Sequence, residues 1–134
     1  MSRRLLISGA ASGIGRALAL AQLAAGAQVC AFDIDTAGLA ELAGQGIVTV
    51  EGDAANPADI ERAARLAVDA FGGLDGLVPC AARSTGRGVT ESDADDWAAI
   101  LALNVTGPAL LARACLPALE ASKGAIVCVA SQLA

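Results

Sequence analysis

The chain alternates short, continuously apolar runs with longer stretches rich in alanine and leucine. A continuous apolar run of four to eight residues is typical of a buried strand, whereas apolar residues at helical spacing over a longer stretch indicate a helix. Strands that alternate with helices form a parallel sheet through right-handed crossovers, with helices on both faces. The pattern therefore predicts an α/β, doubly wound, three-layer fold with strands near residues 5–8, 29–33, 47–50, 74–79 and 125–130.

Capping residues mark the expected helix boundaries. Thr36 is placed to cap a short helix that ends before Gly44, and Asn56-Pro57 opens the next helix with proline in the first turn. Ser92, with an acid three residues on, is close to a capping box before a long helical region, which Gly107-Pro108 should distort. The first helix is expected to turn one apolar face to the sheet, formed by Ile14, Leu18, Ala21 and Ala25.

A glycine-rich turn joins the first strand to the first helix. Gly9 lets the chain leave the strand through a turn that a Cβ would obstruct. Gly13 allows a ligand phosphate to approach the backbone, and Gly15 allows close packing of the helix. Ser12 stands at the N-cap, where its hydroxyl can bond a helix N–H or the ligand. Because free N–H groups and the helix dipole converge here, the turn, including Ile14, is predicted to hold a pyrophosphate.

The glycine spacing is G-x-x-x-G-x-G and not the G-x-G-x-x-G fingerprint. With Ser8 before it, the segment resembles the loop of the short-chain dehydrogenase/reductase family, which binds NAD(H) or NADP(H). The resemblance implies a Rossmann-type fold and hydride transfer between a secondary alcohol or ketone and nicotinamide. It covers nearly all of this chain but only roughly the first half of a family member. We therefore expect one NAD(P)-binding domain over residues 1–134, truncated after the fifth strand.

Two aspartates are candidates for the adenosine side of such a cofactor. Asp33 ends the second strand, where a carboxylate can accept hydrogen bonds from both ribose hydroxyls and repels a 2′-phosphate. This predicts NAD rather than NADP, although Arg16 could compensate a 2′-phosphate. The resemblance assigns Asp53, beside the small residue Ala54, to the adenine ring. The alternative for Asp53 is a turn aspartate before the next helix.

The segment Leu77–Ala82 stands where the family has N-N-A-G, and only Ala81 matches. Pro79, Cys80 and Ala82 depart from the family pattern, so asparagine-mediated bracing of the central strand is not available. The family uses this segment partly through its backbone beside the cofactor, which implies that Cys80 and Ala81 line the cofactor site. A reactive thiol at Cys80 would need a neighbouring base or cation that the sequence does not supply.

Two positions match catalytic residues of the family. Asn104 lies within a helical stretch and resembles the asparagine that holds a water in the proton relay; the alternative is an asparagine at a helix bend. Ser131 follows the fifth strand and resembles the serine that hydrogen-bonds the substrate. The family acid/base is the tyrosine of a Tyr-x-x-x-Lys motif, but this sequence has no tyrosine and Lys123 is its only lysine.

Three functions remain open on this basis. The first is a short-chain oxidoreductase, for which we expect the 134-residue chain to be inactive by itself. The second is a non-catalytic dinucleotide-binding module. The third is a half-enzyme completed by a partner chain that supplies the tyrosine and lysine.

Amino-acid composition limits the classes of partner that we expect for this chain. The net charge of −5 argues against nucleic acid. The four cysteines form no C-x-x-C pair and there is no histidine, so we expect no metal site and a reducing, cytoplasmic location. The uncharged stretch 17–32 is too short for a membrane span, so no membrane contact is expected. A small-molecule alcohol or ketone is the expected substrate, and the family resemblance implies a homo-oligomer in the full-length form.

Overall fold

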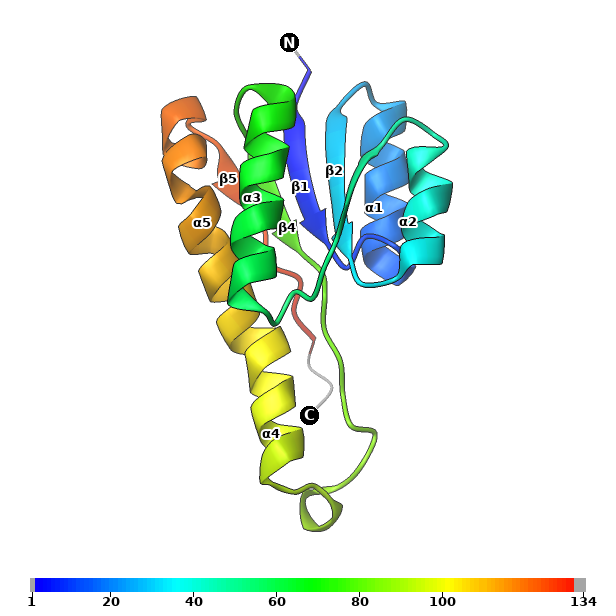
Figure 1. Cartoon of the computed structure of the whole chain (residues 1–134), viewed down its shortest axis with the longest axis vertical. Helices are drawn as coiled ribbons and strands as arrows, with labels where there is room; N and C mark the ends of the chain where they lie inside the picture. The colour runs from blue at the N-terminus through cyan, green and yellow to red at the C-terminus, as the bar shows by residue number, and fades with distance from the viewer. Residues whose placement is uncertain (1, 132–134) are drawn as a thin grey trace.

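The computed structural model describes residues 2–131 and contains a parallel sheet of five strands in the order β3-β2-β1-β4-β5 (Figure 1). The strand order reverses at β1, which is the switch point of a doubly wound sheet. The predicted α/β class and parallel sheet are therefore confirmed. The strands are β1 (Arg4–Ser8), β2 (Gln28–Asp33), β3 (Val48–Glu51), β4 (Gly76–Pro79) and β5 (Ala125–Ile126).

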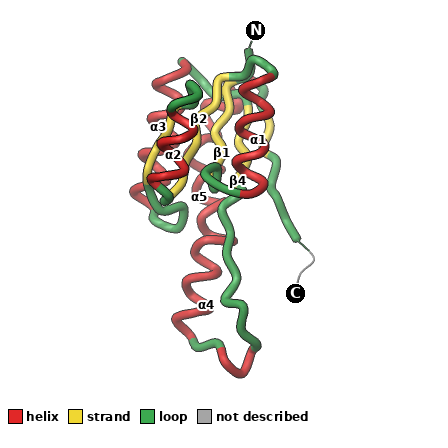
Figure 2. The backbone as a smooth tube through the Cα atoms, turned by 90° about the vertical axis from the view of Figure 1, so that its right-hand side faces the viewer, coloured by secondary structure: helices red, strands yellow, loops and turns green. Residues whose placement is uncertain are grey.

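Helices cover both faces of the sheet. One buried cluster joins one face of the central strands to α3 and α5, and a second joins the other face to α1 and α2. A segment made of α4 and the loop before it extends away from this body as an arm (Figures 1 and 2). The helices are α1 (Gly13–Ala24), α2 (Thr36–Ala43), α3 (Pro57–Phe71), the 3₁₀ turn η1 (Val89–Glu91), α4 (Ala94–Leu101), the π turn η2 (Ala102–Thr106) and α5 (Gly107–Ser122).

The core is built from aliphatic side chains that alternate between the two faces of each central strand. In β1, Leu6 belongs to the cluster under α3 and α5, whereas Leu5 and Ile7 belong to the cluster under α1 and α2. Phe32 of β2 is fully buried and is one of only two phenylalanines in the sequence. Burial on both faces explains why these strands are continuously apolar instead of alternating.

The predicted apolar face of α1 is wrong. Gly15 and Ala19 are the buried residues of this helix, and Ile14 is 66% exposed. Gly15 lies against the backbone of Gly9, where a Cβ would collide with the Gly9 carbonyl. Because the first turn of the helix approaches the backbone this closely, the smallest residues face inward and the larger Ile14 is directed outward. Leu18 packs at the margin of the cluster.

Two helix caps differ from the predictions by one residue. Asp35, not Thr36, caps α2, and its carboxylate accepts the Gly38 N–H at 3.1 Å. Asp93, not Ser92, caps α4 in a reciprocal capping box. In both cases a carboxylate next to the predicted cap takes the role, because it is a strong acceptor for the N–H groups of the first turn. The predicted cap at Asn56 is confirmed.

The fifth strand is much shorter than predicted. Residues 125–130 were expected to form it, but the strand contains only Ala125–Ile126, and Val127 and Val129 are exposed. Val127 donates its N–H to the Leu77 carbonyl at 3.0 Å. The next rung of the parallel ladder would need an N–H at Pro79, which proline lacks. The strand therefore stops pairing with β4 at the point where Pro79 stands.

The expected distortion of the long helix is confirmed and takes the form of a π turn. The turn Ala102–Thr106 separates α4 from α5, and none of its residues is fully buried. Gly107 follows directly and lies against the Ala54 carbonyl, where a Cβ would collide. Single π turns inside helices are frequently found at functional sites.

Candidate functional site

A cavity of about 470 Å³ opens at the carboxyl ends of β1, β2 and β4. In open parallel sheets this edge is where ligands bind. The lining includes every residue predicted above to hold a cofactor. Asn104 and Ser131 do not line it themselves, although Asn104 follows the lining residue Leu103 and Ser131 stands two residues after the lining residue Val129. The predicted cofactor residues that line the cavity are Gly9, Ser12, Gly13, Ile14, Gly15, Asp33, Asp53, Ala54, Cys80 and Ala81.

A larger groove of about 1070 Å³ lies elsewhere, along the uncovered side of β4 and β5. Leu5, Leu18, Leu77, Val78 and Val127 are among its apolar lining residues. It contains none of the residues predicted to carry chemistry. The smaller cavity is therefore the candidate site, because it combines the glycine turn, a helix N-terminus and carboxylates.

The glycine turn forms one wall of the cavity. Gly9 has a φ of +65°, and a Cβ on it would lie 2.6 Å from the Ala81 nitrogen. Gly13 has a φ of +54°, and nothing lies within 4 Å of the position that its Cβ would take. Ser12 is the N-cap of α1, yet its side chain makes no capping hydrogen bond. An open approach to Gly13 beside uncapped N–H groups fits a bound pyrophosphate.

Ser8 ties this turn to the segment after β4. Its buried Oγ accepts the N–H groups of Cys80 at 3.2 Å and Ala81 at 3.4 Å. These bonds hold the ends of β1 and β4 at the separation that Gly9 also requires. The two backbone segments that line the centre of the cavity are thus fixed to one another.

Asp33 has two partners at the end of β2. Its Oδ2 accepts the Ala11 N–H at 2.9 Å, and its Oδ1 accepts the Asp35 N–H at 3.0 Å. Gly38 of α2 packs against Ala11, where a Cβ would lie 2.8 Å from the Ala11 Cβ. Asp33 therefore braces the glycine turn as well as lining the cavity. Each carboxylate oxygen retains a second lone pair for a ligand hydroxyl.

The turn after β3 forms the next part of the wall. Asp53 accepts the Ala55 N–H at 2.8 Å and donates its own N–H to Asp59 at 2.9 Å. The neighbouring backbone of Ala54 rests against Gly107. The pKa of Asp59 is lowered mainly by the hydrogen bond from the Asp53 N–H, and to a smaller extent by the hydrogen bond from the Arg62 side chain. The turn is held from both α3 and α5.

Asn104 joins the π turn to the loop after β4. Its Oδ1 accepts the Arg83 N–H at 3.0 Å, and its Nδ2 donates to the Arg83 carbonyl at 2.8 Å. Arg83 itself lines the cavity. No role was expected for this arginine from the sequence, although its position directly after the segment that stands in place of N-N-A-G is a usable signal.

The cysteine in the cavity is not activated. Burial raises the pKa of the Cys80 thiol, which disfavours the thiolate. Cys30 and Cys115 are deeply buried, and burial raises the pKa of each to about 12. Burial therefore disfavours the reactive thiolate form at each of these three cysteines.

The sequence profile of the short chain dehydrogenase family matches residues 3–134. The chain belongs to this family. Cis-2,3-dihydrobiphenyl-2,3-diol dehydrogenase of Pseudomonas sp. strain KKS102 is 37% identical over 130 residues, which cover 91% of this chain and 47% of that protein. D-threitol dehydrogenase of Mycolicibacterium smegmatis is 37% identical over 139 residues, covering 96% and 52%. The chain thus spans about half the length of these two curated relatives.

Solved structures agree with the family assignment. A 3-ketoacyl-(acyl-carrier-protein) reductase from Brucella melitensis, complexed with NADH, has a TM-score of 0.88 and 28% identity, covering 96% of this chain and 57% of that one. A short chain dehydrogenase from Burkholderia cenocepacia J2315, in complex with NADP, has a TM-score of 0.88 and 30% identity, covering 98% and 56%. The chain therefore carries the NAD(P)-binding Rossmann-type fold of a short-chain dehydrogenase.

One helical stretch in the short-chain dehydrogenase chain, Ala94–Ser122, is long and apolar enough to cross a membrane by length and composition alone. Its second half is a core helix, because Leu111, Cys115 and Leu119 of α5 are buried against the sheet. Packing on the sheet accounts for the apolar character of that half. The first half belongs to the arm, and no α4 residue is fully buried.

Proposed function

We propose that this chain supplies the cofactor site of an NAD(P)-dependent oxidoreductase that interconverts a secondary alcohol and a ketone. The observation that carries the proposal is the convergence, around one cavity, of the open glycine turn, the uncapped start of α1 and Asp33. Bound there, the nicotinamide would accept or supply the hydride. The diol and polyol named in the two curated relatives support an alcohol as the substrate class.

Each part of the cavity has a proposed binding role. The N–H groups from Ser12 to Gly15 hold the pyrophosphate, with the α1 dipole favouring its negative charge. Asp33 accepts the ribose hydroxyls, and this favours NAD over NADP because a 2′-phosphate would meet its negative charge. Asp53 and Ala54 contact the adenine, and Cys80 and Ala81 border the cofactor through their backbone.

Asn104 and Ser131 are the proposed catalytic positions. Ser131 is the last residue that the structure describes and would hydrogen-bond the substrate oxygen. Asn104 would hold a water. Its side chain also positions the loop after β4 through its two hydrogen bonds to Arg83. Neither can move the hydroxyl proton efficiently, because an amide is not basic and an alkyl hydroxyl is a weak acid. A Tyr-x-x-x-Lys element outside these 134 residues is therefore part of the proposal.

The decisive experiment is a fluorescence titration of the purified chain with NADH. We expect the unmodified chain to bind NADH saturably. Replacement of Gly13 by a bulky residue such as valine should abolish this binding. The matched control is Gly86→Val, because Gly86 also has a positive φ and open space around it but does not line the cavity. A chain that does not bind NADH would refute the cofactor site and with it the proposed function.

A further inference from the structure

Among residues 2–131, three charged side chains line the cavity, and Arg83 is the one cation of the three. Asp33 and Asp53 supply two carboxylates, and the whole chain has a net charge of −5. A dinucleotide adds the negative charge of its pyrophosphate to this environment. Repulsion of that kind weakens binding unless a nearby cation offsets it.

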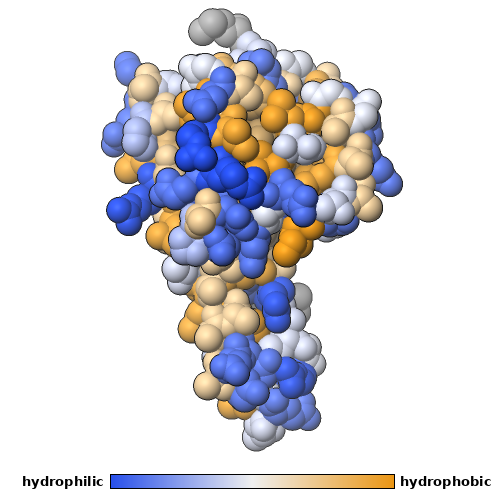
Figure 3. Space-filling model, in the orientation of Figure 1, coloured by the Kyte–Doolittle hydropathy of each residue, from blue (hydrophilic) through white to orange (hydrophobic). Residues whose placement is uncertain are grey.

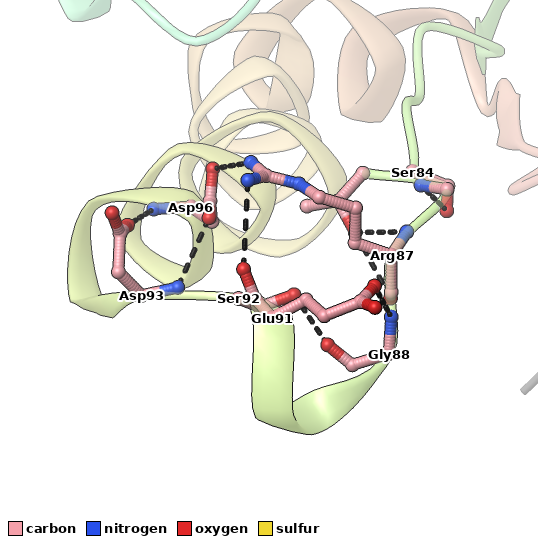
Figure 4. Close-up of polar contacts among 9 residues, drawn as sticks. Ser84, Arg87, Gly88, Glu91, Ser92, Asp93 and Asp96 are labelled. Atoms are coloured by element: carbon pink, nitrogen blue, oxygen red, sulfur yellow. Dashed lines mark hydrogen bonds and ion pairs between the residues drawn. The ribbon is translucent and has the colours of Figure 1, made fainter.

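The guanidinium of Arg83 makes no hydrogen bond or ion pair with the residues that the structure describes, and the side chain is exposed. The other arginine of the same loop is different. Arg87 binds Asp96 at 2.6 Å and donates to the Glu91 carbonyl at 3.5 Å, within the polar network at the end of the arm (Figure 4). Hydrophilic surface gathers at that end (Figure 3). Arg87 thus stabilises the arm, whereas Arg83 retains all of its side-chain donors.

The backbone of Arg83 is already fixed. Asn104 binds both its N–H and its carbonyl, at 3.0 Å and 2.8 Å. Only the side chain has to be ordered when a ligand binds. The planar guanidinium presents paired N–H donors that match phosphate oxygens and form charge-assisted hydrogen bonds.

We propose that Arg83 binds the pyrophosphate of the dinucleotide and so complements the N–H groups at the start of α1. This inference rests on the proposed function, because it concerns a ligand of the same cavity. It adds a cofactor-binding cation on the loop after β4, on the wall that also includes Ala81 and Ala82.

The test compares ligands that share adenosine but differ in the diphosphate. Dissociation constants for NADH, ADP-ribose and adenosine are measured on the purified chain and on Arg83→Gln. NADH and ADP-ribose should bind about tenfold or more weakly to the variant, whereas adenosine should bind equally to both proteins. The difference should shrink as salt is raised, because ions screen an exposed charge pair. Arg83→Lys should recover part of the affinity.

Arg113→Gln is the matched control, because Arg113 is exposed on α5 and does not line the cavity. It should leave all three dissociation constants unchanged. If the unmodified chain does not bind NADH, the proposed function fails. If it binds NADH and Arg83→Gln binds ADP-ribose equally well, Arg83 does not hold the pyrophosphate and the inference is wrong. Equal weakening of adenosine and ADP-ribose would also overturn it, since that would indicate a structural effect.

Discussion

The side-chain amide of Asn104 forms hydrogen bonds with both backbone groups of Arg83, at 3.0 Å and 2.8 Å. The two residues are far apart in sequence and belong to the π turn and to the loop after β4. An asparagine can serve both a donor and an acceptor at once, which alanine cannot do and aspartate can do only in part. The pair therefore joins the π turn to the part of the loop that lines the cavity.

Replacing Asn104 by alanine should release the loop at Arg83. Loss of two partly exposed hydrogen bonds should lower the free energy of unfolding by about 1–3 kcal/mol, and amide hydrogen exchange at Arg83 should become faster. NADH affinity should fall as well, because Arg83, the residue proposed to bind the pyrophosphate, is no longer held in position. Val105→Ala is the control, since Val105 is a 60% exposed neighbour in the same turn. Unchanged exchange at Arg83 would contradict the prediction.

Asp33→Ala should weaken NADH binding more than NADPH binding, because only the unphosphorylated ribose is expected to use this carboxylate. Both cofactors should lose some affinity, since Asp33 also holds the Ala11 N–H at 2.9 Å. Dissociation constants from fluorescence titration provide the measurement. Asp69→Ala, an exposed acid on α3 outside the cavity, is the control. Equal losses for the two cofactors would show that Asp33 does not select the ribose.

Gly107→Ala should be destabilising and should displace the turn at Ala54. The added Cβ would collide with the Ala54 carbonyl, and overpacking of this kind costs about 1–3 kcal/mol. Denaturant unfolding gives the stability, and adenosine binding reports on the turn. Gly88→Ala is the matched control, because Gly88 has a φ of −76° and nothing near its Cβ position. Similar stability of both variants would argue against close packing at Gly107.

Arg4 and Asp75 should make stability depend on acid pH. Arg4 donates from Nε and Nη2 to the two Asp75 oxygens, each at 2.9 Å, and this pairing lowers the pKa of Asp75. A carboxyl pKa that is lower in the folded state stabilises the fold above the unfolded value, near 4, and that contribution is lost as the pH falls through the folded pKa.

Thermal unfolding of Asp75→Asn tests this dependence. The variant should melt a few degrees below the unmodified chain at pH 7, and the two should converge as the pH falls below 4, once Asp75 is protonated in both states. Asp95→Asn serves as the control, since Asp95 is exposed and lies outside the sheet. A difference in melting temperature that stays constant from pH 7 to pH 3 would exclude the ion pair as its source.

The order of elements and the residues of the cavity could be predicted because local features determine them. Apolar runs mark the strands, and glycine at positions 9, 13 and 15 has few uses other than a tight turn into a helix. Asp33 and Asp53 could be placed because Asp33 ends β2 and Asp53 stands two residues after the end of β3 in a parallel sheet. Such features require no knowledge of distant contacts.

Features that depend on distant neighbours were missed. The length of β5 depends on Pro79 in another strand, and the inward face of α1 depends on how closely Gly15 approaches Gly9. The Asn104 amide could be matched to a family position, but its partner at Arg83 lies in a loop whose path the sequence pattern does not indicate. The position of Arg83 in the cavity wall was missed for the same reason.

The interrupted ladder between β4 and β5 divides the site into two parts with different freedom to evolve. The proposed cofactor site is built into the sheet and its turns, where an added Cβ at Gly9 or Gly15 would collide with neighbouring backbone. Beyond Val127, whose N–H makes the last ladder bond to β4 among residues 2–131, sequence changes leave that ladder intact. Variation around the proposed catalytic serine can therefore alter the proposed substrate contacts without disturbing the proposed dinucleotide site.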